Sequence, residues 1–251
     1  MPRIYAGTSG WAYSSWKPKF YPAKLRASEF LNYYASRLNS VEVNYTFRNF
    51  PTKRLLREWL AATPESFIFA IKAHYAITHV KRLRGAFRTT SKFLNSLRPL
   101  RDAGRLGPVL FQLPPFLKCD VPLLENFLAR LPDGARSAFE FRHASWFNEE
   151  VYSALRKANA ALCLAESEKI ETPQVETADF SYLRLRKDSY SPQARGSIAA
   201  RVVDLSSRGD VFVFFRHEAA PHGALYAERL LAGTITPSSL TMNQPVSSTE
   251  T

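Results

Sequence analysis

The stretch that decides the fold is Ser137-Ala138-Phe139-Glu140-Phe141-Arg142-His143. A β-strand points alternate side chains to opposite faces, so Phe139 and Phe141 share one face while Glu140 and Arg142 share the other. One face is therefore apolar and the other is charged. Because a buried carboxylate and guanidinium need partners, the pattern indicates either a structural Glu140–Arg142 pair or a polar ligand beside the strand.

Similar strand-like segments recur along the chain, with helix-like segments between them. Strands are predicted over residues 4–9, 40–47, 67–74, 107–115, 137–141, 161–166, 180–186 and 211–216. Helices are predicted over residues 28–38, 52–62, 90–100, 122–131, 149–159, 194–207 and 219–231. This alternation implies parallel strands joined by right-handed crossovers. We predict an α/β fold, a TIM-like (β/α) barrel of about eight parallel strands, with an irregular link over residues 168–177 replacing the helix after strand six.

The barrel is predicted to occupy residues 1–233 as one domain, and 45% hydrophobic residues suffice for a large core. Residues 234–251 are rich in Ser, Thr and Pro, so we expect a disordered tail. The sequence contains neither an apolar run of the ~18 residues that a membrane span needs nor a signal peptide, which predicts a cytoplasmic location. Cys119 and Cys163 lack C-x-x-C spacing and are predicted to be free thiols.

A formal net charge of +12 favours anionic partners, because a positive field raises the local concentration of anions. Nucleic acid and phosphorylated small molecules both fit this charge. A solvated basic surface explains scattered Lys and Arg equally well, so charge alone does not choose among them.

The strongest pattern lies at the carboxyl ends of the predicted strands, where the active sites of such barrels lie. The amino ends of the same strands are mostly apolar. A ring of polar groups at one end would cost stability unless the groups serve a ligand or each other. The polar strand ends are Trp11, Glu42, Asn44, Lys72, His74, Gln112, Glu140, Arg142, His143, Glu166, Arg184, Arg186 and Arg216.

Several motifs stand in order along the chain: Gly7-Thr8-Ser9-Gly10-Trp11, Val41-Glu42-Val43-Asn44, Phe69-Ala70-Ile71-Lys72-Ala73, Leu110-Phe111-Gln112-Leu113-Pro114-Pro115 and Phe139-Glu140-Phe141-Arg142-His143. Together they resemble the YecE-like family, domain of unknown function 72. The match spans nearly the whole predicted barrel. The resemblance implies a TIM-barrel-like fold and a shared pocket, and it implies no particular reaction.

The residue types at the strand ends suit an oxyanion such as phosphate. Lys72, Arg142 and Arg184 offer one ammonium and two guanidinium groups. Asn44 and Gln112 add neutral donors.

Glu42 and Glu140 would balance the cations or act in acid–base catalysis. A carboxylate near cations stays ionised, so Glu140 is the candidate base. Internal pairing across the mouth of the barrel is the alternative.

Three more residues complete the predicted ligand contacts. His143, Trp11 and Trp146 lie in or beside loops at the predicted mouth, where large rings can stack on bases or sugars or simply pack the loops. No cofactor motif is present. Cations between the glutamates would repel a divalent ion, so no metal site is predicted.

We therefore predict a barrel that binds a phosphorylated or other anionic ligand at its carboxyl-terminal mouth, with phosphoester processing as the candidate activity. A nucleic-acid binding protein without catalysis is the first alternative. A metal-dependent hydrolase or nuclease is the second.

Overall fold

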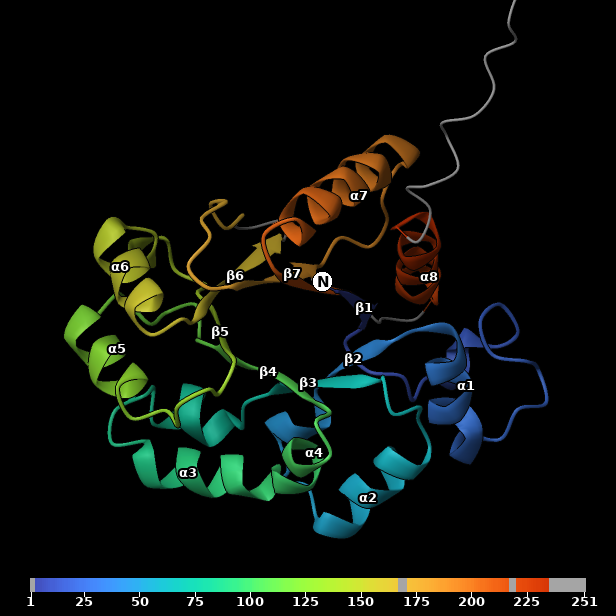
Figure 1. Ribbon diagram of the computed structural model, residues 1–251, viewed down its shortest axis with the longest axis horizontal. Coiled ribbons are helices and arrows are strands. Elements are labelled where there is room, and N and C mark those ends of the chain that lie inside the picture. Colours follow the sequence, from blue (N-terminus) through green and yellow to red (C-terminus); the bar gives the residue numbers. More distant parts are fainter. Residues whose placement is uncertain (1–2, 167–170, 217–219, 235–251) are drawn as a thin grey trace, which may run out of the picture.

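Eight parallel strands form a nearly closed barrel surrounded by helices, which confirms the predicted TIM-like fold (Figure 1). The computed structural model describes residues 3–166, 171–216 and 220–234. The strand order in the sheet is β1-β8-β7-β6-β5-β4-β3-β2. The strands are β1 (Ile4–Thr8), β2 (Ser40–Val43), β3 (Ile68–Lys72), β4 (Leu106–Gln112), β5 (Ser137–Glu140), β6 (Ala161–Glu166), β7 (Phe180–Leu185) and β8 (Asp210–Phe215).

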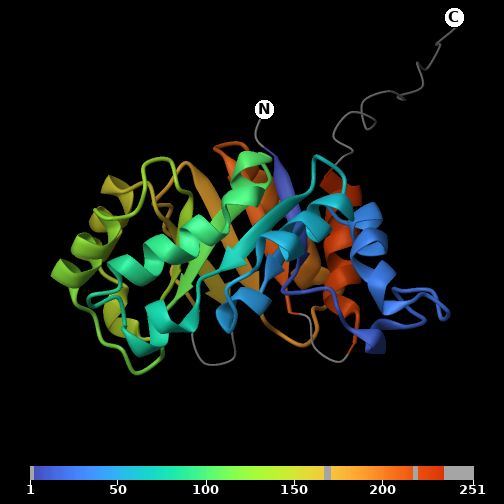
Figure 2. The same ribbon diagram turned by 90° about the horizontal axis from the view of Figure 1, so that it is seen from below.

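The helices pack around the outside of the barrel (Figure 2). Several begin at a side chain that accepts a hydrogen bond from a first-turn amide, as Thr52, Asp120, Asn148 and Ser191 do. The α-helices are α1 (Phe30–Arg37), α2 (Lys53–Ala61), α3 (Phe87–Ser96), α4 (Arg98–Asp102), α5 (Val121–Leu128), α6 (Glu149–Lys157), α7 (Pro192–Ser206) and α8 (His222–Thr234). Short 3-10 turns cover Ser14–Trp16, Ala27–Glu29, Tyr45–Phe47 and Ala144–Trp146, and Ala76–Val80 forms a π-helical turn.

The core has two layers separated by the sheet. Phe139 and Phe141 belong to the layer between sheet and helices, as the strand alternation predicts, while Ala138 belongs to the barrel interior. The interior combines large rings with small side chains, which lets opposite strands interdigitate. Its members are Tyr5, Ala70, Leu110, Ala138, Ala161, Cys163, Ala165, Phe180, Tyr182, Phe212 and Phe214.

Some predicted boundaries differ from the structure. The strand predicted over 40–47 ends at Val43, because the chain turns into a 3-10 helix in which the Thr46 hydroxyl lies 2.7 Å from the Lys72 carbonyl oxygen. The helix predicted over 90–100 is two helices, α3 and α4, with Pro99 in the first turn of α4, where no amide is required.

Other predicted features fall near undescribed residues. Residues 171–177 of the predicted irregular link contain no helix, and residues 167–170 lie outside the described part of the chain. Helix α8 reaches Thr234, and residues 235–251 of the predicted tail lie outside the description. Within the described ranges, no helix combines the length and apolar character that crossing a membrane requires. The cytoplasmic location stays a prediction.

The seam between β1 and β2, the two ends of the strand order, is bridged by a side chain. The Asn39 side-chain amide accepts a hydrogen bond from the Ala6 amide at 2.9 Å and donates one to the Ile4 carbonyl oxygen at 2.8 Å. The Asn39 side-chain amide therefore makes the hydrogen bonds to β1 that a neighbouring strand would make.

Tyr34 of α1 bridges the same seam. Its buried hydroxyl accepts a hydrogen bond from the Thr8 amide at 2.8 Å and donates one to the Ser40 carbonyl oxygen at 3.1 Å. The close approach needs glycine at position 7, because a Cβ there would lie 1.9 Å from the Ser40 carbonyl oxygen. The seam thus depends on one glycine and two side chains.

We expect Gly7→Ala to lower the free energy of unfolding by roughly 3 kcal/mol, the upper end of overpacking costs, because backbone must move to admit the methyl group. Gly196→Ala is the matched control: position 196 lies in α7 with open space around a new Cβ, and alanine favours helix. Urea unfolding of both variants measures the difference. Equal stability of the two variants would show that β1 and β2 can move apart at the seam without loss of stability.

Candidate functional site

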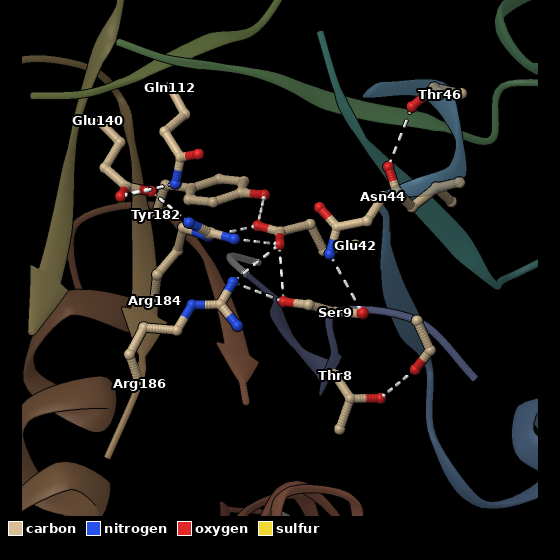
Figure 3. A network of polar contacts seen from close by, with 12 residues as sticks. Thr8, Ser9, Glu42, Asn44, Thr46, Gln112, Glu140, Tyr182, Arg184 and Arg186 are labelled. Atoms are coloured by element: carbon tan, nitrogen blue, oxygen red, sulfur yellow. Dashed lines mark hydrogen bonds and ion pairs between the residues drawn. The ribbon is translucent and has the colours of Figure 1, made fainter. Parts of the chain in front are cut away.

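Glu42 lies at the centre of the polar network that fills the top of the barrel (Figure 3). Its fully buried carboxylate accepts hydrogen bonds from Ser9 Oγ at 2.7 Å and Tyr182 Oη at 2.8 Å. Arg184 Nε and Nη2 each donate at 2.8 Å, and Arg186 Nη2 donates at 3.0 Å. Burial alone would raise the pKa of Glu42, but Arg184 and Arg186 outweigh it and hold the pKa well below its ordinary value.

Glu140, at the end of β5, is the second buried carboxylate. It accepts a hydrogen bond from Gln112 Nε2 at 2.8 Å and a short one from Arg184 Nη1. Arg142 Nε lies 3.9 Å from its Oε1. Burial pushes the pKa of Glu140 upward, and Arg184, Arg186 and the Gln112 hydrogen bond together lower it below the ordinary value.

Arg184, on β7, joins the two carboxylates. Its side chain is only 5% exposed, and it donates to Glu42 on β2 and to Glu140 on β5. A buried charge is tolerable only when it is paired and hydrogen-bonded, and here two guanidinium groups from Arg184 and Arg186 meet two carboxylates. We call Glu42, Glu140, Arg184 and Arg186 the ionic cluster.

Lys72, at the end of β3, has no such partner. It is partly buried, its Nζ lies 4.2 Å from the centre of the Phe47 ring, and it forms no ion pair with any carboxylate in the described part of the chain. Burial is the main cause that lowers the pKa of Lys72 to about 8, and Arg184 lowers it further against the opposing effect of Glu42 and Glu140.

His79 and Arg48 lie around Lys72 and were not predicted from sequence. The His79 ring meets the Phe47 ring edge-on at 5.1 Å, and Arg48 lies over the same Phe47 ring at 5.4 Å. Burial, then Lys72, Arg142 and Arg48, lower the pKa of His79. His79 comes from the π-helical turn after β3, and only its place soon after a predicted strand end could have indicated it.

Asn44 presents an unused acceptor beside the ionic cluster. Its Nδ2 donates to the Ser9 carbonyl oxygen at 3.2 Å, and Figure 3 shows the amide oxygen turned away from Ser9. That buried Oδ1 has no hydrogen-bond partner among the described residues. Exchanging the amide atoms would place two acceptors together at Ser9, so the free atom is the oxygen.

The structure corrects the prediction for Trp146 and shows Trp11 packed against another ring. Trp146 is fully buried, stacks on Phe141 with ring centres 4.6 Å apart and donates to the Leu117 carbonyl oxygen at 2.8 Å. Trp11 packs edge-on against Trp59 of α2 at 5.4 Å. Both rings pack the loops, and a buried ring such as Trp146 cannot stack on a ligand.

His143 has a local structural contact. Its Nδ1 accepts a hydrogen bond from the Ser145 amide at 3.2 Å, which caps the 3-10 turn Ala144–Trp146, and it lies 2.8 Å from Ser145 Oγ. The structure therefore brings together Glu42, Glu140, Lys72, Arg142, Arg184, Asn44 and Gln112 of the predicted residues. It adds Ser9, Tyr182, Arg186, Phe47, Arg48 and His79.

No three His, Cys, Asp or Glu side chains group as metal ligands within the ranges that the structure describes. The two buried glutamates have Arg184 between them, and both already accept guanidinium hydrogen bonds. This donor set is poorly suited to a divalent ion, because a cation already occupies the place between the carboxylates.

The fold and the ring of polar strand ends define a TIM-like barrel with a cluster of polar side chains at the carboxyl ends of its strands. A family model described as "Protein of unknown function DUF72" matches residues 5–246. The chain therefore belongs to the DUF72 family, which confirms the resemblance found in the sequence.

Individual relatives agree with this assignment. A DUF72 family protein from Thermotoga maritima MSB8 is similar with a TM-score of 0.84 and 29% identity, over 93% of this chain and 100% of that chain. The UPF0759 protein YunF of Bacillus subtilis (strain 168) is 31% identical over 156 residues, 59% of this chain and 54% of that protein. The chain thus matches about half the length of this curated relative.

A more distant likeness concerns the fold alone. An AP endonuclease of family 2 from Brucella melitensis has a TM-score of 0.54 and 11% identity, over 90% of this chain and 97% of that chain. Unrelated functions occur on one barrel fold, so this likeness carries no chemistry to the present chain.

We expect Arg184→Met to cost about 3–5 kcal/mol of unfolding free energy at pH 7, because it leaves two buried carboxylates without their shared partner. Arg208→Met, which removes an exposed arginine paired with Glu176 and Asp204, should cost far less, because solvent screens exposed ion pairs. Urea unfolding at several pH values measures both.

The pH dependence of this loss in unfolding free energy distinguishes lost charge pairing from lost packing. The folded pKa of both glutamates is lowered, so their stabilisation is present above the unfolded value of about 4.3 and is lost as the pH falls below that value towards the lowered folded pKa. The deficit of the Arg184→Met variant should therefore be full at pH 7 and shrink as the pH falls below about 4. A deficit independent of pH would assign the loss to packing.

Proposed function

We propose that the carboxyl-terminal mouth binds a phosphorylated or other anionic small molecule. The support is an excess of positive charge around the mouth. Two carboxylates, Glu42 and Glu140, are outnumbered by the cations Arg48, Lys72, Arg142, Arg184 and Arg186. An anion would relieve the repulsion among these cations.

One observation carries the proposal: neither Lys72 nor Arg142 forms a carboxylate contact at hydrogen-bond distance among the described residues. Arg184 and Arg186 donate to carboxylates at hydrogen-bond distance. Lys72 has no carboxylate partner among the described residues, and Arg142, 44% exposed, has a single ion pair at 3.9 Å. We assign Lys72 and Arg142 as direct ligand contacts, with Asn44 Oδ1 accepting from a ligand hydroxyl.

The glutamates have a different role in this proposal. Glu42 is enclosed by five donated hydrogen bonds, and the lowered pKa of Glu140 makes it a weak base. Both hold Arg184 in place below the ligand, which favours positioning over proton transfer. Preorganised cations stabilise the charge that develops in phosphoryl transfer, so phosphoester processing is the activity we favour.

Nucleic-acid binding without catalysis is the second candidate, and the net charge of +12 supports it. The two candidates differ in their salt dependence. Binding to single- or double-stranded oligonucleotides should fall steeply with salt if the whole basic surface takes part. Absence of oligonucleotide binding at low salt would remove this candidate.

We expect Arg142→Ala to weaken binding of inorganic phosphate about tenfold, because one charge-assisted hydrogen bond contributes about 1.5–3 kcal/mol. Isothermal titration at fixed ionic strength measures the change. Arg156→Ala is the matched control, since the Arg156 side chain is 45% exposed, lies on α6 and pairs with Glu149.

Unchanged phosphate affinity in the Arg142→Ala variant, or equal losses in both variants, would contradict the assignment. Loss of the folded state, followed by circular dichroism, would show that Arg142 is structural. Either result would remove Arg142 from the proposed site.

A further inference from the structure

We propose, on the basis of the anion site above, that Lys72 is a catalytic nucleophile that forms an imine with the carbonyl carbon of a small phosphorylated aldehyde or ketone. This inference names a substrate class and a reacting atom for the mouth. Three features of the Lys72 amine support it. The amine lies among cations, it packs on the Phe47 ring, and it lies near Asn44, whose Oδ1 has no partner among the described residues.

The geometry around Lys72 differs from that of a lysine that serves as a salt-bridge partner. Its Nζ packs over the face of Phe47 at 4.2 Å and has no carboxylate partner in the described ranges. The nearby carboxylates, Glu42 and Glu140, are already bonded to Arg184. A desolvated lysine next to other cations is the arrangement that activates an amine as a nucleophile.

The charges around Lys72 favour its neutral form. Burial and Arg184 lower its pKa to about 8, so a useful fraction of the amine is unprotonated near neutral pH. The charged and titratable groups of the surrounding elements are Glu42, Glu140, Arg184 and Arg186, with His79, Arg48 and Arg142 beyond them. The cations in this set outnumber the carboxylates.

The neighbouring groups fit the two ends of such a substrate. Arg142 and Lys72 both lower the pKa of His79, so both cations lie near that ring. Asn44 follows directly after β2 and Lys72 ends β3, and these two strands pair with each other with Val43 opposite Ile71. Arg142 would hold the phosphate while Lys72 reaches the carbonyl, and Asn44 Oδ1 would accept from the carbinolamine hydroxyl.

The chemistry balances without a further reactant. The lone pair of Nζ attacks the carbonyl carbon, the carbon–nitrogen bond forms, the carbon–oxygen π bond breaks, and one Nζ proton passes to the carbonyl oxygen to give the carbinolamine. The carbinolamine takes a proton from the medium and loses its hydroxyl as water, and the remaining Nζ proton returns to the medium to leave the imine. One amine and one carbonyl thus yield one imine and one water, with no change in oxidation state.

The test is reductive trapping of the full-length protein with D-glyceraldehyde 3-phosphate and sodium cyanoborohydride, followed by peptide mass spectrometry. Lys72 should be modified more than about tenfold faster than exposed Lys157 at pH 7.5, because a pKa of about 8 leaves far more unprotonated amine than the ordinary lysine value of about 10.4 does. Inorganic phosphate should compete with the modification. The rate at Lys72 should level off above pH 8.

Two variants test the roles of Lys72 and Arg142 separately. Lys72→Arg keeps the positive charge but should lose the adduct at position 72 while still binding phosphate. Arg142→Ala should slow trapping of D-glyceraldehyde 3-phosphate and leave trapping of uncharged D-glyceraldehyde unchanged.

The outcomes distinguish this inference from the proposed function. Phosphate binding without preferential modification of Lys72 would overturn the imine and leave the anion site in place. Modification of Lys72 at equal rates by both aldehydes, with no phosphate binding, would support the nucleophile and overturn the phosphorylated substrate. If the protein neither binds phosphate nor shows preferential modification of Lys72, both the anion site and the imine are overturned.

Discussion

The guanidinium of Arg184 between the carboxylates of Glu42 and Glu140 is the interaction on which the upper barrel depends. It joins β7 to β2 and β5, strands that are not neighbours in the sheet. Ser9, just after β1, reaches the same cluster through Glu42. This bond crosses the seam that Asn39 and Tyr34 bridge lower down. The site and the closure of the barrel therefore share one structural support.

The pairing of Arg184 with Glu42 and Glu140 limits which charged side chains a ligand could contact. A buried ion pair that is fully hydrogen-bonded has little charge left for a ligand, and its value lies in fixed geometry. Lys72 and Arg142 differ because their nearest carboxylates are already held by Arg184. In the proposed site the ionic cluster would serve as a rigid support, and Lys72 and Arg142 would be the cations that contact the ligand.

Alternation along the strands made the fold and the placement of the polar ring predictable. Phe139 and Phe141 fall on the helix side and Glu140 in the barrel because a strand has a period of two. Which polar strand ends pair with each other was not predictable, since the contact of Arg184 with Glu42 depends on the register around the barrel. Trp146 was misplaced because a ring in a loop can pack inward or face solvent with the same local sequence.

Membership of the DUF72 family gives the chain a fold and leaves the reaction to be argued from the site. The two carboxylates best placed for acid–base work are held ionised by arginines, so they are weak proton acceptors. The depressed pKa of Lys72 makes this amine more available at neutral pH than an ordinary lysine. The same cations that would bind an anion also suppress protonation of that amine. Anion recognition and nucleophilic chemistry at this mouth would thus have one electrostatic cause.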